Sequence, residues 1–212
     1  MESGTRVFLL SPASSAGRRA QLLMRDAAAF PLALRVREAD APLEEVFTFL
    51  SGLYFRGKVA YARAFAQPPP GVAPAYVITS SRGLIPFDEP VTISVLREFA
   101  AVPIGTESRA FVDALLRTAL ALDRRIDSAT QLVLLGSIAT GKYVEPLVRV
   151  FGDRLRFPAE FVGRGDMSRG GLMLRCADDA RELDYVPFDG RVRHGPRPPK
   201  LEPLRRGRAV RR

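Results

Sequence analysis

The strongest constraint on the fold is a set of three short apolar runs without polar alternation: RVFLL at 6–10, YVIT at 76–79 and QLVLL at 131–135. Runs of this length and composition are typical of strands that are buried on both faces of a sheet. Segments with helical periodicity separate them, so we expect parallel pairing through right-handed crossovers. The sequence therefore predicts an α/β fold, with a mostly parallel central sheet flanked by helices.

The spacing of apolar residues also predicts where the helices lie. We expect helices at 18–30, at 43–66 with a break at Ser51 and Gly52, at 107–124 and near 142–151. Farther along the chain, we expect two strands, at 172–175 and 182–186, joined by a turn at Asp178 and Asp179. We therefore expect a C-terminal β-hairpin added to the sheet.

The positive charge of the chain is concentrated at its end. The 212 residues carry a formal net charge of +9, and 191–212 hold nine Lys and Arg against a single acid, Glu202. That leaves about +1 for residues 1–190, which with 47% hydrophobic residues overall can form one domain around one core. The last segment has four prolines and few large apolar residues, so we predict a disordered basic tail at 191–212.

Composition excludes several classes of protein. A single cysteine, Cys176, cannot form an intramolecular disulfide, and with one histidine, His194, it cannot build a Cys/His zinc site. The lone histidine lies in the predicted tail, which argues against a Ser/His/Asp triad. No signal peptide and no membrane-spanning run is evident. We expect a cytoplasmic protein with no membrane partner, no metal and no cofactor.

The sharpest local motif is GSIATGK at 136–142, which places Gly136, Ser137, Thr140 and Lys142 between a strand and a helix. The spacing G-x-x-x-x-G-K in this context is typical of loops that bind phosphate. The Ser or Thr that would hold Mg²⁺ is replaced by Tyr143. Three interpretations stay open: a plain turn with a surface lysine, a general phosphate or anion site, and an ATPase loop.

A second polar segment is GRGDMSRGG at 163–171, whose four glycines permit close approach of the backbone to a ligand. Arg164, Ser168 and Arg169 suit a phosphate group, and Asp166 can hydrogen-bond a base or transfer a proton. The alternative is a solvated loop with an internal Asp–Arg pair.

Two further loops follow the first two predicted strands. SSRGLIPFD at 80–88 supplies Ser80, Gly83 and Asp88, and the loop at 11–17 begins with Ser11. Because ligands of parallel sheets bind at the carboxyl ends of the strands, these loops and GSIATGK predict one cleft. We take Asp166 and Asp88 as the candidate catalytic carboxylates.

The helix at 54–65 interleaves aromatic and basic residues. Such a pattern can stack bases and hold phosphates, but rings at helical spacing are more simply explained as core. Cys176, in a predicted apolar strand, is interpreted as a buried inert thiol.

Several segments together resemble the YaaA-like peroxide-stress proteins and their small bacterial relatives. They are RVFLLSPAS, LYFRGKVAYARAFA, YVITSSRGLIPFDE and GKYVEPL, within about 6–171, and a similar arrangement occurs in the central domain of archaeosine synthase. Arg82 stands where the family often has tyrosine, and Ser14 where it has a lysine. The resemblance implies an α/β fold and a link to DNA or modified nucleobases.

These observations leave three hypotheses for function. The first is a nucleic-acid protein, with DNA favoured over RNA, that binds or acts on a nucleobase or nucleotide in the cleft. In this hypothesis Arg205, Arg206, Arg208, Arg211 and Arg212 of the tail add attraction to phosphates. The second is an enzyme that binds a nucleotide or phosphometabolite through GSIATGK, and the third is a non-catalytic stress-response module.

Overall fold

The computed structural model describes residues 4–188 and 194–201 and contains a six-stranded sheet of order β4-β3-β1-β6-β7-β8. Its four central strands run parallel: β3 (Ala75–Thr79), β1 (Arg6–Leu10), β6 (Gln131–Leu135) and β7 (Leu155–Pro158). The edge strands β4 (Gly83–Pro86) and β8 (Tyr185–Pro187) pair antiparallel with their neighbours. The predicted α/β class with a mostly parallel sheet is confirmed.

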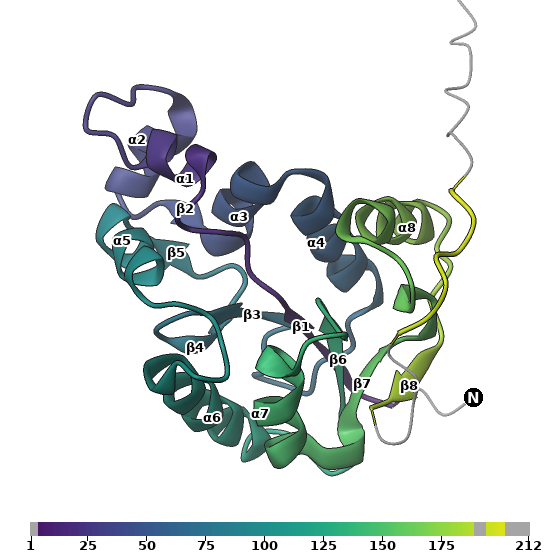
Figure 1. The fold of residues 1–212 in the computed structure, drawn as a ribbon. Helices are drawn as coiled ribbons and strands as arrows, with labels where there is room; N and C mark the ends of the chain where they lie inside the picture. Colours follow the sequence, from purple (N-terminus) through teal and green to yellow (C-terminus); the bar gives the residue numbers. More distant parts are fainter. Residues whose placement is uncertain (1–3, 189–193, 202–212) are drawn as a thin grey trace, which may run out of the picture.

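Helices cover both faces of this sheet (Figure 1). The helices are α1 (Arg18–Leu23), α2 (Pro31–Arg37), α3 (Leu43–Ser51), α4 (Leu53–Phe65), α5 (Ile93–Ala101), α6 (Arg109–Asp123), α7 (Gly141–Phe151) and α8 (Asp166–Asp178). In Figure 1, α4 and α8 lie together on one side of the sheet, and α6 and α7 lie together on the other. Two short 3₁₀ turns, Gly152–Arg154 and Ala159–Phe161, flank β7, and β2 (Ala41–Pro42) pairs with β5 (Pro90–Val91) in a second, two-stranded sheet.

The central strands are apolar throughout because both of their faces are covered. Residues 7–10 of β1 and 132–135 of β6 are fully buried, and the two strands pair in register from Arg6 opposite Gln131 to Leu10 opposite Leu135. Alternate side chains of β1 face opposite helix layers. Phe8 packs edge-on against Tyr61 of α4, with ring centres 5.7 Å apart. The three strands predicted from apolar runs are therefore three of the four central strands, β3, β1 and β6.

The predicted C-terminal hairpin is wrong in its first strand. Residues 172–175 lie in α8, which begins at Asp166, and only the second predicted strand has a counterpart, in β8. The buried residues Arg169, Leu172, Met173 and Cys176 recur at helical spacing, and Cys176 is thus in a helix. The glycine pair within 163–171 looked like a loop, but Gly170 is where α8 crosses α4: a Cβ there would lie 2.8 Å from the Tyr54 Cα.

The observed bounds of several other elements differ from the predicted ones for local reasons. The helix predicted at 18–30 ends at Leu23, and Pro31 starts the separate helix α2, in keeping with the preference of proline for the first helical turn. The connection after β3 is the strand β4, which turns back at Gly83. Residues 194–201 form no helix or strand, and the rest of the predicted tail lies outside the described residues. None of the described helices is both long and apolar enough to cross a membrane.

Candidate functional site

A cavity of about 360 Å³ opens where the carboxyl ends of β1 and β3 meet the start of α7. Besides helices α3 and α5, four segments line it: residues 12–16 after β1, Thr79 and Ser80 at the end of β3, residues 102–104 after α5, and Lys142 with Tyr143 in the first turn of α7. This is the edge of a parallel sheet at which ligands are usually bound.

One wall of the cavity is apolar. Phe47 of α3 and Phe99 of α5 both line it and pack edge-on, with ring centres 6.3 Å apart, and the side chains of Val102, Pro103 and Ile104 continue the lining. Ser80 is not free for a ligand, since its hydroxyl donates to the Phe99 carbonyl at 2.7 Å. That bond ties the end of β3 to α5 and holds Phe99 at the cavity.

Lys142 is the one cation in the lining. It forms no ion pair within the described part of the chain, and its Nζ lies 4.9 Å from the centre of the Tyr143 ring. The peptide N–H groups of the first turn of α7 add partial positive charge, and no side chain caps them. The Glu145 carboxylate folds back against Gly141, close to this helix end.

Directly after β1, Ser11 contacts a buried amine. Lys58 of α4 is 1% exposed, and its Nζ donates to the Ser11 carbonyl at 2.8 Å and to the Ser11 hydroxyl at 2.7 Å. The Nζ also lies 3.8 Å from the centre of the Tyr54 ring. Burial lowers the pKa of Lys58 to about 7, opposed by the negative charge of Asp166 and assisted by the positive charge of Arg169.

Tyr54 and Arg169 complete this buried group. The Tyr54 hydroxyl is buried and forms no hydrogen bond of good geometry among the described residues. Burial, helped by the charge of Asp166 and opposed by nearby Arg169 and Ser11, raises the pKa of Tyr54 to about 12. Arg169 is 6% exposed and donates to the main-chain carbonyls of Phe161 and Gly136, and it also lies close enough to the Tyr54 hydroxyl to lower the pKa of Tyr54. These hydrogen bonds connect α8 to the loop after β6. Asp166, in contrast, is exposed at the start of α8.

The structure brings together part of the predicted site. Ser80, Lys142 and Tyr143 line the cavity, and Ser11 lies behind it against Gly136, where a Cβ would be 2.7 Å from the Ser11 Cβ. Ser137 and Thr140 stand in the loop that leads to Lys142, with their hydroxyls 3.4 Å apart. Asp166 and Arg169 act electrostatically on Lys58 and Tyr54 from α8.

The other predicted residues lie elsewhere. Gly83 packs against α6, and Asp88 is exposed beyond β4; neither lines the cavity. Arg164 and Ser168 line a separate groove of about 300 Å³ along α8. The tail residues Arg205, Arg206, Arg208, Arg211 and Arg212 lie outside the described residues.

That groove on α8 is basic. It is formed between α8 and 197–201, and its cationic lining consists of Arg164, Arg175, Arg197 and Lys200. None of the described residues that line it is acidic. We call this surface the basic groove.

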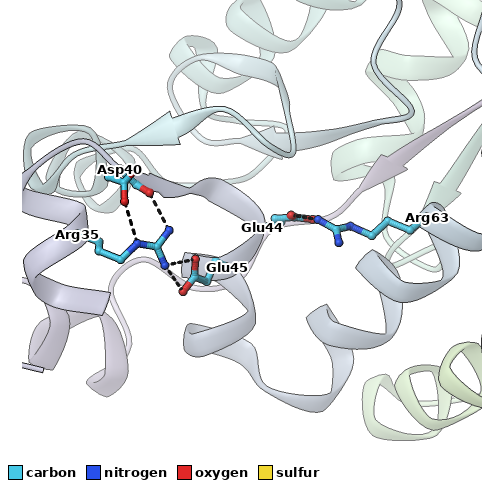
Figure 2. A network of polar contacts seen from close by, with 5 residues as sticks. All are labelled: Arg35, Asp40, Glu44, Glu45 and Arg63. Carbon is cyan, nitrogen blue, oxygen red and sulfur yellow. Dashed lines mark hydrogen bonds and ion pairs between the residues drawn. The ribbon is translucent and has the colours of Figure 1, made fainter. Parts of the chain in front are cut away.

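A further hollow, between α3 and α4, is instead close to neutral. Two carboxylates, Glu44 and Glu45, and two guanidinium groups, Arg56 and Arg63, line it. Figure 2 shows that Glu44 pairs with Arg63, while Glu45 is held 2.7 Å from Arg35, which also binds Asp40. These charges neutralise one another, so the hollow has little attraction for a charged ligand.

Lys58 and Tyr54 are the residues that the sequence analysis missed. Both lie in the helix predicted at 54–65, whose rings were interpreted as core and whose basic residues were considered only as possible phosphate contacts. The sequence did contain one signal, the position of Lys58 along the helix. Residues 54, 58, 61 and 62 share one face of α4, and Lys58 alone interrupts the otherwise apolar stripe that they form.

The chain was also compared with known proteins. No family model matches it, and no curated protein and no solved structure is significantly similar to it.

Proposed function

We propose that the protein binds a nucleotide in the strand-end cavity. The observation that supports this best is the combination of an apolar, partly aromatic wall with one unpaired cation, Lys142, in a cavity of about 360 Å³. A base placed against Phe47 and Phe99 buries its faces, and a phosphate at Lys142 receives a charge-assisted hydrogen bond. Such a volume lies in the range of small-molecule sites.

The helix end supports the same orientation of the ligand. The first turn of α7 presents free peptide N–H groups beside Lys142, which favours an anion there. Tyr143 stands where an ATPase loop would have its Mg²⁺ ligand, so we propose binding of a nucleotide rather than ATP hydrolysis. The resemblance to YaaA-like proteins stays a prediction and points to the same class of ligand.

Mononucleotide binding should depend on Lys142 through the phosphate alone. In calorimetric titrations with AMP, GMP, CMP and UMP, we expect Lys142→Ala to weaken the nucleotide that binds best by about 10-fold or more, because a charge-assisted bond is lost. Binding of the matching nucleoside should be unchanged. Lys200→Ala, in the basic groove, is the matched control and should bind the nucleotide as the wild type does.

Glu145→Gln sharpens the test, since it removes a negative charge near the proposed phosphate. It should strengthen nucleotide binding and leave nucleoside binding alone. Equal loss of nucleotide and nucleoside affinity in Lys142→Ala, or no binding of any of the four nucleotides, would contradict the proposal.

The basic groove favours a second function, association with a nucleic-acid strand. Arg164, Arg197 and Lys200 place positive charge along the groove, which attracts phosphates of any sequence. The chain continues beyond the groove into a segment rich in arginine. In this proposal the strand lies along α8, and the cavity receives one of its nucleotides.

Salt dependence measures this contribution. For binding of a fluorescent single-stranded oligonucleotide, each phosphate contact adds about 0.7 to the slope of log K against log salt concentration. The double variant Arg197→Gln/Lys200→Gln should therefore lower the slope by roughly 1.4. Lys142→Gln, which removes one charge outside the groove, gives the change in slope for a single charge. An unchanged slope in the double variant would rule out the groove as a binding surface.

A further inference from the structure

The Ser11–Lys58 pair lies immediately behind the cavity and has no role in the nucleotide binding proposed above. Lys58 donates to both the hydroxyl and the carbonyl of Ser11, and no carboxylate of the described residues forms an ion pair with it. A buried lysine without an acidic partner is costly to keep charged. This arrangement is unusual for a residue that only supports the fold.

Burial is the largest influence on Lys58, and it favours the neutral amine. The rings of Tyr54 and Phe55, from its own helix, have their centres 3.8 Å and 5.4 Å from Nζ and attract the charged form only partly against this. From α8, Arg169 repels the ammonium while Asp166, which is exposed, attracts it. Tyr143 of α7 interacts with Tyr54, and its phenol stays protonated because burial raises its pKa. With its pKa at about 7, Lys58 is an amine able to accept a proton at neutral pH.

Ser11 is held in place by the sheet. Its N–H donates to the Leu135 carbonyl at 3.2 Å, which continues the β1–β6 pairing by one residue. Gly136 lies directly against it, and a side chain at 136 would crowd both the Cβ and the hydroxyl of Ser11. The residues that follow Ser11, 12–16, and Tyr143 line the cavity. The serine therefore directly precedes the cavity lining in the chain and is held at a fixed position beside it.

The Tyr54 hydroxyl supplies the third group. It is buried and forms no hydrogen bond of good geometry among the described residues, but it lies close enough to the Ser11 hydroxyl and to Arg169 for both to lower its pKa. Its ring contacts the Lys58 amine, so its hydroxyl belongs to the same cluster as Ser11. A hydroxyl placed beside the serine oxygen, and not committed to a well-aligned hydrogen bond, can donate to an oxyanion that forms there during a reaction.

We propose that Ser11 is a nucleophile and Lys58 its general base in the hydrolysis of a carboxylic ester held in the cavity. The Ser11 Oγ attacks the carbonyl carbon and its proton passes to the Lys58 Nζ. The bond from that carbon to the alcohol oxygen breaks, and the alcohol leaves with the proton from Lys58. Water then attacks the acylated Ser11, again giving a proton to Lys58, and the acid is released as the Ser11 hydroxyl is restored.

The Tyr54 hydroxyl donates to the oxyanion in both tetrahedral intermediates. This activity goes beyond the proposed nucleotide binding and does not depend on it, because none of its three groups holds the phosphate. A purely structural Lys58 would instead tie α4 to the end of β1 and leave Ser11 as unreactive as any other serine.

Covalent labelling of the full-length protein separates these roles. With diisopropyl fluorophosphate, we expect one phosphoryl group per chain by intact mass, mapped to Ser11 by peptide analysis. Ser11→Ala should lose the label, and Ser94→Ala, which alters an exposed serine of α5, should keep it. Lys58→Met, a replacement of similar length without charge, should slow labelling by about 100-fold. The wild type and the three variants should rank in the same order in their rates of hydrolysis of 4-nitrophenyl acetate.

The pH profile gives a readout that a structural role would not produce. Because the base is the neutral amine, the labelling rate of the wild type should rise with pH and level off above about 7. This measurement decides the matter even if Lys58→Met fails to fold. A label on another residue, a rate that does not change between pH 5.5 and 8.5, or equal labelling of Ser11 in a folded Lys58→Met variant would each overturn the proposal. Failure of nucleotide binding alone would leave it standing.

Discussion

Alanine at Gly83 should lower the free energy of unfolding by about 3 kcal/mol, from two separate causes. The residue has a φ of +70°, a conformation that costs an L-residue about 1–2 kcal/mol. A Cβ there would also lie 2.2 Å from the Thr118 hydroxyl and 2.3 Å from the Ala114 carbonyl. The hydroxyl cannot simply rotate away, because it donates to that same carbonyl and accepts from the Leu84 N–H.

Gly71→Ala is the matched control for this effect. Gly71 has a nearly equal φ of +74°, but nothing lies within 4 Å of a Cβ built there. Its alanine variant should therefore lose only the conformational part, about 1 kcal/mol. Urea denaturation of the two variants measures the difference. Equal losses would show that the turn between β3 and β4 does not pack against α6 as described.

Alanine at Gly170 should cost about 2 kcal/mol, because it forces α8 away from α4. A Cβ at this position would lie 2.8 Å from the Tyr54 Cα and 2.9 Å from the Leu53 carbonyl oxygen, both backbone atoms of the neighbouring helix. Overpacking against a rigid backbone typically costs about 1–3 kcal/mol, and the better helix propensity of alanine returns up to about 1 kcal/mol of it. The crossing of α4 and α8 also positions Tyr54, Lys58 and Arg169.

The adjacent glycine provides the control in the same helix. A Cβ at Gly171 would meet only the Leu201 side chain, at the ordinary contact distance of 3.5 Å. Gly171→Ala should therefore leave stability unchanged or raise it by up to about 1 kcal/mol. Thermal and urea unfolding compare the two variants directly. If Gly170→Ala were as stable as Gly171→Ala, the close crossing of the two helices would be wrong.

The central strands of the sheet were predictable because a strand that is buried on both faces has a continuous run of apolar residues. Continuous apolar runs identified β1, β3 and β6, and the polar loops after them led to the region of the cavity. The edge strands β4 and β8 are short and end in proline, and β8 is only partly buried, so their pattern is weak. The start of α8 was missed because its glycines serve a helix crossing rather than a loop.

Half of the candidate site could be predicted and half could not. Ser80, Lys142 and Tyr143 were found because they follow strands in glycine-containing segments. The apolar wall depends on α3, α5 and the loop after α5 meeting in space, which no local pattern reveals. Lys58 was missed because a lysine between aromatic residues on a helix is normally solvated, and only the tertiary structure places its amine against Ser11.

The most direct test of the central claim is a crystal structure of the protein soaked with the mononucleotide that binds best in the titrations. We expect the base to lie against Phe47 and Phe99, and a phosphate oxygen to lie within hydrogen-bonding distance of the Lys142 Nζ. A nucleotide found only in the basic groove along α8, with the strand-end cavity empty at saturating concentration, would contradict it.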